Sequence, residues 1–565
     1  MDHHKNPALL PAIIFLFLLI VSCHHSSSKE SVLVTSPEQM DRNASESIKN
    51  LLDNALGNNG KINDSTRLQF ASAVTAFYKD ADFTIFWSHK EKWEPLADSL
   101  YGFIANGERE GLFPRDYHFK ELSALKQMLD HDSLKRMDAV LWSDVDLLLT
   151  DGFMHLIKDL KHGRLQHDSV NVGSDSLFAD NFFVKNLKEL KEKKDFSGLM
   201  NSLQPTFKGY WELKKGIKSF VDSMDRHVYS YVSYPYKGST DSARFIKELQ
   251  ARLSESGCMD PVAKPVDSAQ LKAAIVKYQK QKGITADGKV TTSFIRALNT
   301  SDAERFKRIA ITLDRYKLLP EKMPERYIWV NLPSYYLQVW DSDTLVMESK
   351  TIVGKPATRT PLLNSYISNM VTYPTWTVPT SIIAKEMLPG LKRNTGYLAK
   401  KGLRLLNNKG EEVDPSSINW SKYKKGIPFK IQQGSGDDNA LGIFKFNFNN
   451  PYAVYLHDTN QRYLFKNATR AISHGCVRVQ DWQKLANYIA RTDSANAKTN
   501  ESLSYTSDSI RSWIAAKKHI QMEVKTKIGV YIRYFSCEGK NGKIRFYDDI
   551  YGEDKILREK YFADK

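Results

Sequence analysis

The sequence has few cysteines and, beyond its first residues, no long apolar stretch. Only four cysteines occur in 565 residues: Cys23, Cys258, Cys476 and Cys537. Four are too few for a disulfide scaffold in a chain of this length. After the first segment, no apolar run reaches the roughly 20 residues that a membrane-spanning helix needs. Because domains commonly contain about 100–200 residues, the chain is expected to form several folded units.

Two signatures of nucleotide or nucleic-acid chemistry are also missing. No glycine-rich loop of the type that cradles phosphate groups occurs, which argues against a nucleotide-dependent activity. Lys and Arg number 81 against 65 Asp and Glu, a net charge of +16. This excess fits an anionic polymer or membrane, but charges of both signs are mixed and no long basic run occurs. Nucleic acid is therefore not an expected partner.

The first segment predicts export from the cytoplasm. Lys5 precedes an apolar run over residues 8–21, which suits the apolar region of a signal peptide and is too short to span a bilayer. Ile20-Val21-Ser22-Cys23 resembles a bacterial lipobox, in which the cysteine is lipidated and becomes the new N-terminus. The resemblance implies a lipid-anchored protein of the cell envelope and periplasm. His24, in place of an aspartate, favours the outer membrane if the source is Gram-negative. The alternative is an uncleaved anchor with an incidental cysteine.

Hydrophobic periodicity changes along the chain and predicts a multidomain α+β protein. Apolar residues recur at three- and four-residue spacing between about residues 67 and 231, which predicts helices. From Arg326 the period becomes two, which predicts strands. A polar insert over about residues 384–430 interrupts the strand pattern. The expected strands cover residues 327–332, 335–340, 345–353, 444–448 and 452–458, with a last hairpin over 530–537 and 544–547.

Two segments carry the residue types of nucleophilic catalysis. In Tyr455–Thr459, strand alternation places Tyr455 and His457 on one face. Cys476 is expected just before a helix over residues 480–489, whose dipole would favour the thiolate. A cysteine and a histidine together can attack a carbonyl group and form a thioester. The amides of Gly475 and Cys476 are expected to donate to the developing oxyanion.

Two other interpretations of these residues remain open at this stage. Cys476 could be a buried structural cysteine beside a core histidine at position 457. Cys476, His474 and His457 are also zinc-ligand types, but a fourth ligand at short spacing is missing.

The motif Ser473-His474-Gly475-Cys476-Val477-Arg478, preceded by a strand histidine, resembles the signature of the YkuD-type L,D-transpeptidases. Residues 241–300 resemble a three-helix peptidoglycan-binding-like domain. Further segments resemble the large YcbB-like subgroup: 359–362, 376–379, 439–442, 470–473 and 549–552. The implied layout is a signal peptide (1–22), a flexible tether (23–66), an α-helical scaffold domain (67–240), the peptidoglycan-binding-like domain (241–300) and a β-rich L,D-transpeptidase catalytic domain (301–565) with a capping insert at about 384–430. Within the tether, residues 45–56 suit a helix.

The resemblance implies an enzyme that cleaves a tetrapeptide stem of peptidoglycan before its terminal D-alanine. The acyl group passes through a cysteine thioester to an amine of a second stem, giving a 3→3 cross-link without a metal or an organic cofactor. The implied partners are the donor and acceptor stem peptides, together with the membrane through the lipid anchor. The rival functions are an L,D-carboxypeptidase with the same thioester and a non-catalytic cell-wall-binding lipoprotein.

The resemblance also implies a role for each residue of the motif. Cys476 is the nucleophile and His457 the general base, while Ser473, His474 and Gly475 shape the turn around the thiolate. Arg478 holds a substrate carboxylate, or makes a structural ion pair. Tyr455 and Trp376 line the acyl pocket, or only pack in a core. Cys258 and Cys537 are expected to be buried apolar residues, with a disulfide between them as the alternative.

Overall fold

The computed structural model describes residues 31–64, 66–166, 180–234, 238–261, 267–283, 285–497 and 505–563. The predicted signal peptide and Cys23 lie outside the described residues. The chain divides into two compact units, Met1–Asp98 with Lys120–Asp151, and Ser99–Phe119 with Gly152–Lys565. Within the described ranges, no helix has both the length and the apolar character required to cross a bilayer.

The first unit is helical and closes around a buried carboxylate. Asp146 is fully buried and accepts hydrogen bonds from the Tyr78 hydroxyl at 2.6 Å and from the amides of Phe86 and Trp87 at 2.8 Å each. The elements from residue 37 to residue 161 are η1 (Pro37–Gln39), α1 (Met40–Gly57), α2 (Ala71–Asp80), β1 (Ser88–His89), β2 (Lys92–Trp93), α3 (Pro95–Ala105), η2 (Gly107–Glu110), η3 (Pro114–Tyr117), α4 (Phe119–His131), α5 (Ser133–Arg136) and α6 (Ala139–Lys161).

Helix α1 corrects the prediction of a flexible tether over residues 23–66. Met40, Ala44, Ile48, Leu52 and Ala55 lie on one face of α1 and are fully buried. Their spacing of three and four residues gives the helix an apolar stripe, although the segment is polar on average. The tether prediction is wrong for this stretch, whereas the helix expected over residues 45–56 is confirmed and begins earlier, at Met40. Burial of the apolar stripe stabilises this helix despite the polar composition of the segment.

The second unit contains further helices and a small helical bundle. Val232, Phe245, Leu249, Ile275 and Leu298 belong to the buried core of that bundle, which α10, α11 and α12 form. A separate core joins α9, α13, α18 and the hairpin of β16 (Cys537–Lys540) and β17 (Lys543–Phe546). The helices are α7 (Asp180–Lys193), α8 (Phe196–Ser202), α9 (Lys208–Asp222), α10 (Gly238–Glu255), α11 (Ser268–Gln281), α12 (Thr292–Asn299), α13 (Asp302–Lys317), α16 (Trp482–Asn496), α17 (Ser507–Ala515) and α18 (Glu553–Tyr561).

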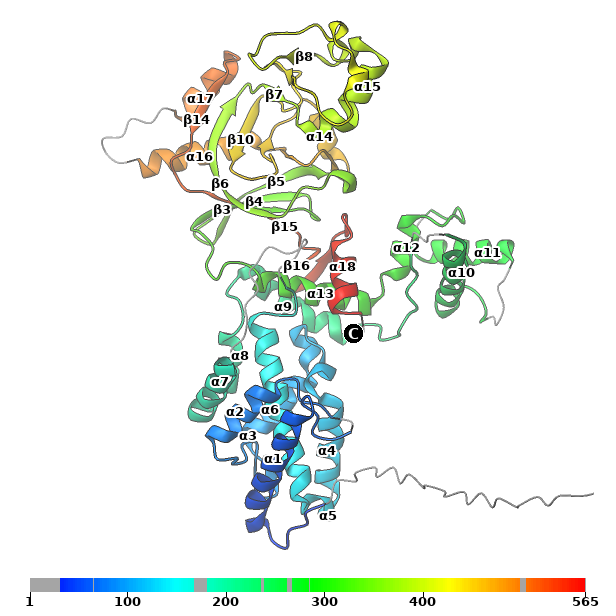
Figure 1. The fold of residues 1–565 in the computed structure, drawn as a ribbon, viewed down its shortest axis with the longest axis vertical. Coiled ribbons are helices and arrows are strands. Elements are labelled where there is room, and N and C mark those ends of the chain that lie inside the picture. Colours follow the sequence, from blue (N-terminus) through cyan, green and yellow to red (C-terminus); the bar gives the residue numbers. More distant parts are fainter. Residues whose placement is uncertain are drawn as a thin grey trace, which may run out of the picture. The chain divides into compact units, whose positions relative to one another are not determined.

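The centre of the β-rich region is a ten-stranded sheet in the order β10-β11-β13-β5-β4-β3-β15-β6-β14, with β12 beside β5. Strand β10 also pairs with β6, so the path from β10 to β6 closes on itself. Figure 1 shows β3, β4, β5, β6 and β10 gathered in this sheet, with α16 and α17 beside it. The strands are β3 (Arg326–Asn331), β4 (Tyr336–Asp341), β5 (Thr344–Gly354), β6 (Leu363–Thr372), β10 (Phe444–Phe448), β11 (Leu456–His457), β12 (Ala471–Ser473), β13 (Val477–Val479), β14 (Ile520–Glu523) and β15 (Gly529–Arg533).

Strand alternation explains which side chains fill this sheet. Phe444, Phe446 and Phe448 are buried, whereas the residues between them are half-buried, as the period of two predicts. Trp482 of α16 stacks on Phe444 with ring centroids 5.1 Å apart. The predictions for β3, β4, β5 and β10 are confirmed to within a residue or two of their ends.

Two strand predictions are wrong. Residues 452–455 are not in a strand: Ala453 has a positive φ of 53°, and β11 begins only at Leu456. The expected hairpin over 530–537 and 544–547 is also wrong, because β15 joins the large sheet between β3 and β6. The hairpin consists instead of β16 (Cys537–Lys540) and β17 (Lys543–Phe546). The period of two cannot distinguish these partners, since it is the same for every strand.

The capping insert has its own sheet and core and begins before the predicted residue 384. Its strands β7 (Trp376–Thr377), β9 (Lys430–Gln433) and β8 (Leu403–Leu406) pair in that order. Leu391, Leu405 and Ile431 are among the residues buried within the insert. The insert also contains the helical segments α14 (Thr380–Ile382), η5 (Ile383–Met387) and α15 (Leu388–Arg393). Figure 1 shows β7, β8, α14 and α15 in yellow-green. The η5 segment is a π-helix, and its first residues lie next to the pocket described below.

Candidate active site

The structure brings all the predicted site residues of the catalytic domain to one pocket. The walls come from the end of β11, the turn before β13 and the start of the insert. The pocket is lined by Trp376, Tyr455, His457, Ser473, His474, Gly475, Cys476 and Arg478, among other residues.

The pairing of β11 with β13 places the cysteine near the histidine. These two strands are parallel, with His457 opposite Arg478 and Leu456 opposite Val477. The Val477 amide donates to the Tyr455 carbonyl at 3.1 Å, which extends the pairing by one residue. Cys476 directly precedes β13 and therefore lies beside Tyr455 at the start of β11. Tyr455 and His457 lie on the same face, with ring centroids 5.6 Å apart, so the alternation prediction is confirmed.

The surroundings of Cys476 differ from the prediction. A strand, not a helix, follows the cysteine, and α16 begins only at Trp482, so Cys476 does not lie at the N-terminus of this helix as predicted. Burial raises the pKa of the Cys476 thiol, while hydrogen bonding from Tyr455 and the charges of Lys445 and Arg478 lower it. These groups offset only part of the effect of burial, so the pKa of the Cys476 thiol is raised overall and the neutral thiol is the favoured form.

Lys445 is a site residue that the sequence interpretation missed. In the β10–β11 register it lies opposite His457, and its Nζ is 4.0 Å from the centroid of the Tyr455 ring. Burial lowers the pKa of the Lys445 ammonium group, and the nearby Cys476 opposes that shift. The sequence signal was available, because Lys445 alternates with the buried Phe444 and Phe446 and must leave the core face.

His457 is buried and remains neutral over most of the pH range. Burial and the charge of Arg478 lower the pKa of the His457 imidazole to about 3. Hydrogen bonding with the backbone of Asp458 and Leu441 raises this pKa and offsets part of the shift. The Nδ1 atom is buried and has no hydrogen-bond partner among the described residues. A neutral imidazole can accept the proton of a neutral thiol, which is what a general base must do.

The turn that carries Cys476 is held by the Ser473 hydroxyl. Ser473 Oγ accepts the Gly475 amide at 3.1 Å and donates to the Cys476 carbonyl at 2.7 Å. Gly475 has a φ of 126°, which favours glycine because a side chain would be strained there. The Gly475 amide is therefore already bonded, and the prediction that it donates to an oxyanion is wrong. The Cys476 amide has no recorded acceptor in the described part of the chain.

His474 points to the capping insert. Its Nε2 lies 2.6 Å from Glu386 Oε1 in η5, and Lys355 Nζ lies 3.9 Å from the same oxygen. Both partners of the shorter contact are partly exposed. Glu386 is a second residue that the sequence did not indicate, because its partner lies far away along the chain and only the fold brings the two together.

Arg478 reaches the pocket without a carboxylate partner. Burial lowers the pKa of its guanidinium group, and its one recorded hydrogen bond runs from Nη1 to Gln461 Oε1 at 3.3 Å. Its Nε is buried without an acceptor, and no ion pair of Arg478 occurs among the described residues. The structural ion pair that was the alternative role is therefore absent from this part of the chain.

The other cysteines lie outside the pocket. Cys258 and Cys537 are free and buried, which confirms the expectation of buried apolar residues over a disulfide. Burial raises the pKa of the Cys537 thiol to about 12. Within the described ranges, no three His, Cys, Asp or Glu side chains lie close enough together to hold a metal ion.

Sequence families match three parts of the chain. Residues 325–501 match the YkuD family, described as the "L,D-transpeptidase catalytic domain". Residues 72–217 match a "Scaffold domain", and residues 242–298 match a "Putative peptidoglycan binding domain". The chain is thus a multidomain protein whose parts are similar to a helical scaffold domain, a peptidoglycan-binding domain and a β-rich L,D-transpeptidase catalytic domain.

Individual relatives agree with the family matches. The chain is 34% identical over 251 residues to a Haemophilus influenzae protein named "Putative L,D-transpeptidase". The match covers 44% of this chain and 49% of the relative, so the chain spans about half the length of the curated relative it matches. Membership of the YcbB-like subgroup stays a prediction.

Solved structures give weaker likenesses. The catalytic domain of the E. faecium L,D-transpeptidase acylated by ertapenem is 15% identical with a TM-score of 0.15, covering 28% of this chain and 83% of that one. The Mycobacterium smegmatis L,D-transpeptidase is 9% identical with a TM-score of 0.18, covering 37% and 58%. At these scores neither likeness adds to the sequence matches.

The position of Lys445 predicts its effect on the thiol. Replacement of Lys445 by Met removes a cation that favours the thiolate, so we expect the pKa of Cys476 to rise. The pH dependence of alkylation by iodoacetamide measures this pKa. Lys484→Met, at an exposed position of α16, is the control and should leave the midpoint unchanged. An unchanged midpoint for Lys445→Met would show that this charge does not act on the thiol.

The low pKa of His457 predicts a particular pH profile. Because the imidazole titrates near pH 3, we expect acylation of Cys476 to show no inflection from histidine between about pH 5 and 8, where an ordinary histidine titrates. His457→Ala should slow acylation by a β-lactam of the carbapenem class on the order of 100-fold or more. Stopped-flow fluorescence over this pH range checks both points, and an unchanged rate in His457→Ala would exclude it as the base.

Proposed function

We propose that the protein is a peptidoglycan L,D-transpeptidase that forms 3→3 cross-links through a thioester on Cys476. The observation that carries this proposal is the shared pocket of Cys476, neutral His457 and unpaired Arg478 within the YkuD-type catalytic domain. Because the chain spans only half of its curated relative, the activity and substrates of the whole protein rest on the chemistry of this pocket.

The first half-reaction forms the acyl-enzyme. His457 accepts the thiol proton as Cys476 Sγ attacks the carbonyl carbon between the diamino acid and the terminal D-alanine. The carbon–sulfur bond forms, and the electron pair of the carbonyl moves to its oxygen. When the tetrahedral intermediate collapses, the carbon–nitrogen bond breaks and His457 returns the proton to the amine of the leaving D-alanine. The product is a thioester.

The second half-reaction transfers the acyl group to an amine. The side-chain amine of an acceptor stem attacks the thioester carbon, an amide bond forms and the carbon–sulfur bond breaks. His457 takes the proton from the amine and Cys476 recovers it as a thiol. The residues of the insert that line the pocket, Trp376, Pro379 and Ile382, would limit the access of water that competes with this amine.

The charges near the pocket suit a donor with free carboxylates. Arg478 offers a buried Nε without an acceptor, which a carboxylate can occupy as a charge-assisted hydrogen bond. Tyr455 and Trp376 would form the wall beside the acyl chain. The net charge of +16 favours association with the anionic cell wall.

We further propose that the protein works in the cell envelope, anchored by lipid on Cys23 and facing the periplasm. The support is the apolar run over residues 8–21 and the lipobox-like Ile20–Cys23, both of which precede the described residues. Labelling of cells with a radioactive fatty acid would test this anchor, with Cys23→Ser as the control that should lose the label.

The nature of the acyl transfer is tested with purified tetrapeptide muropeptides. Wild-type protein should convert them to cross-linked dimer and free D-alanine, as measured by mass spectrometry. Cys476→Ala should abolish the product while the circular dichroism spectrum is unchanged, because the contacts of the thiol, to the Ala453 carbonyl at 3.8 Å and with Tyr455, are weak and local. Tripeptide as the sole product would indicate an L,D-carboxypeptidase, and unaltered tetrapeptide would contradict the proposal.

The role assigned to Arg478 predicts a specific kinetic change. Arg478→Gln removes the charge but keeps much of the side chain, so we expect KM for the tetrapeptide donor to rise roughly tenfold or more, the cost of a charged hydrogen bond. Arg462→Gln, which removes an arginine paired with Asp458 at 2.6 Å, is the comparison for a merely structural charge. Equal KM values for Arg478→Gln and wild type would exclude a role in carboxylate binding.

A further inference from the structure

A hydrogen bond to the Gly475 carbonyl oxygen fixes the orientation of the peptide group between Gly475 and Cys476. Thr360 Oγ1 donates to the Gly475 carbonyl oxygen at 2.7 Å. In a trans peptide the C=O and the following N–H point in opposite directions. The bond to Thr360 therefore directs the Cys476 amide away from Thr360. The Gly475 amide is occupied by Ser473 Oγ, whereas the amide of Cys476, the donor nearest to the sulfur, has no acceptor in the described part of the chain.

Thr360 is itself held in one orientation. Its hydroxyl accepts the Gly354 amide at 2.9 Å, which leaves its proton for Gly475. Its amide donates to the Tyr551 hydroxyl at 3.2 Å, and that hydroxyl donates to the Gly354 carbonyl at 2.6 Å. Thr360 is 2% exposed and Tyr551 4%, so water does not compete for these bonds. A Cβ at position 354 would lie 2.2 Å from the Thr358 carbonyl oxygen, so only glycine fits this approach.

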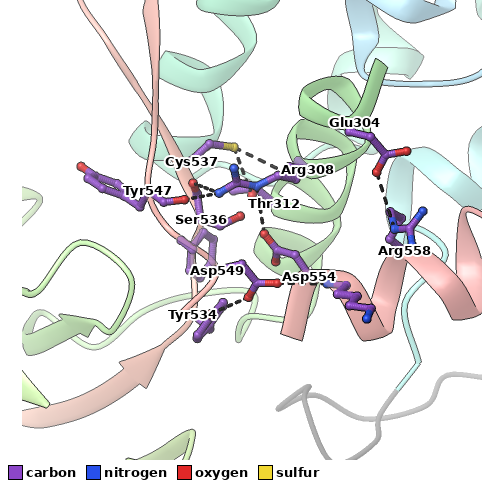
Figure 2. Close-up of polar contacts among 12 residues, drawn as sticks. Glu304, Arg308, Thr312, Tyr534, Ser536, Cys537, Tyr547, Asp549, Asp554 and Arg558 are labelled. Atoms are coloured by element: carbon purple, nitrogen blue, oxygen red, sulfur yellow. Dashed lines mark hydrogen bonds and ion pairs between the residues drawn. The ribbon is translucent and has the colours of Figure 1, made fainter. Parts of the chain in front are cut away.

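Tyr551 lies near the end of the chain and is anchored by a buried polar network. Its amide donates to the Tyr534 hydroxyl at 3.0 Å, and Tyr534 donates to Asp549 Oδ1 at 2.5 Å. Figure 2 shows Tyr534 beside Asp549, and Asp554 of α18 facing Arg308 of α13.

The ion pairs of α18 fix this anchor on α13. Asp554 Oδ2 lies 3.2 Å from Arg308 Nε, and Asp554 Oδ1 lies 2.7 Å from Arg315 Nη1. Asp554 and Arg315 are both more than nine-tenths buried, so loss of one partner would leave an unpaired buried charge. The segment that carries Tyr551 is thus rigidly connected to α13.

We propose that Thr360, supported by Tyr551, is a positioning residue that orients the Cys476 amide toward the oxyanion formed during acyl transfer. Through this relay the last residues of the chain contribute to the reaction rate, although none of them touches the substrate. The inference rests on the proposed function only in that Cys476 must accept an acyl group. It does not depend on the identity of the natural substrate.

Two small reagents separate oxyanion stabilisation from reactivity of the thiol. With 4-nitrophenyl acetate, Cys476 Sγ attacks the ester carbon, the electron pair moves to the carbonyl oxygen, and collapse expels 4-nitrophenolate, which is measured by absorbance. With iodoacetamide, the sulfur displaces iodide from a saturated carbon and no oxyanion forms. Both rates are measured on the full chain, and the rate of Cys476→Ala is subtracted to remove reaction elsewhere.

Thr360→Val should lower the rate with 4-nitrophenyl acetate about ten- to hundredfold. This loss is at most that of removing one oxyanion donor outright, because the Cys476 amide is still present and only its orientation is relaxed. The rate with iodoacetamide and its pH midpoint should stay within about twofold of wild type, because the thiol itself is unchanged. Thr360→Ser keeps the hydroxyl and should restore most of the esterolytic rate. Tyr551→Phe should show a smaller loss with the same selectivity for the ester.

The matched control is Thr372→Val. Thr372 is fully buried in β6 and donates from Oγ1 to the Lys518 carbonyl at 2.7 Å, the same kind of bond at a site not connected to the turn. This variant should react like wild type with both reagents. An equal loss of both rates in Thr360→Val, or no loss of either, would overturn the proposal. Failure of the proposed function would instead appear as wild-type protein that reacts with the ester but forms no dimer from tetrapeptide.

Discussion

The parallel pairing of β11 with β13 is the contact on which the site depends. Both strands are short, and neither would persist alone, but each is part of a sheet that closes through the pairing of β10 with β6. The large aromatic side chains of β10 and Trp482 of α16 fill the interior beside them. Because the sheet is closed, Cys476 and His457 have little freedom to separate, and their pocket exists before a substrate arrives.

The same closure determines the electrostatics of the pocket. Burial acts on Cys476, His457, Lys445 and Arg478 together and favours the neutral form of each. The charges of Lys445 and Arg478 oppose the rise in the pKa of the Cys476 thiol. The same charges reinforce the fall in the pKa of the His457 imidazole. The resulting state, a neutral thiol near a neutral base with positive charge close by, favours proton transfer at the moment of attack over a stable ion pair. This differs from a thiolate held by a helix dipole, which the sequence suggested.

Much of the fold could be predicted from local pattern. The alternation of Phe444, Phe446 and Phe448 indicated a strand with one buried face, and the meander of β3, β4 and β5 followed from its period and turns. The partners of each strand could not be predicted in this way. The sequence of residues 530–533 suits a strand in a hairpin as well as a strand in a large sheet. Only the pairing with β3 and β6 in the folded protein decides between these two arrangements. For α1, the sequence indicated a helix over residues 45–56, and the fold extends it to Met40 by burying its apolar stripe.

The sequence alone determined which residues have the right chemistry and which share a strand face. It was sufficient to select Cys476, His457, Arg478, Tyr455 and Trp376, which the structure brings to one pocket, because the proposed nucleophile, base and neighbours form short motifs. The tertiary structure decided what surrounds them: Lys445 across the sheet, Glu386 on the insert, and Thr360 with Tyr551 behind the turn. The physical reason is that pKa values and the orientation of an amide depend on burial and on hydrogen-bond partners from distant segments. Neither is encoded in residue spacing.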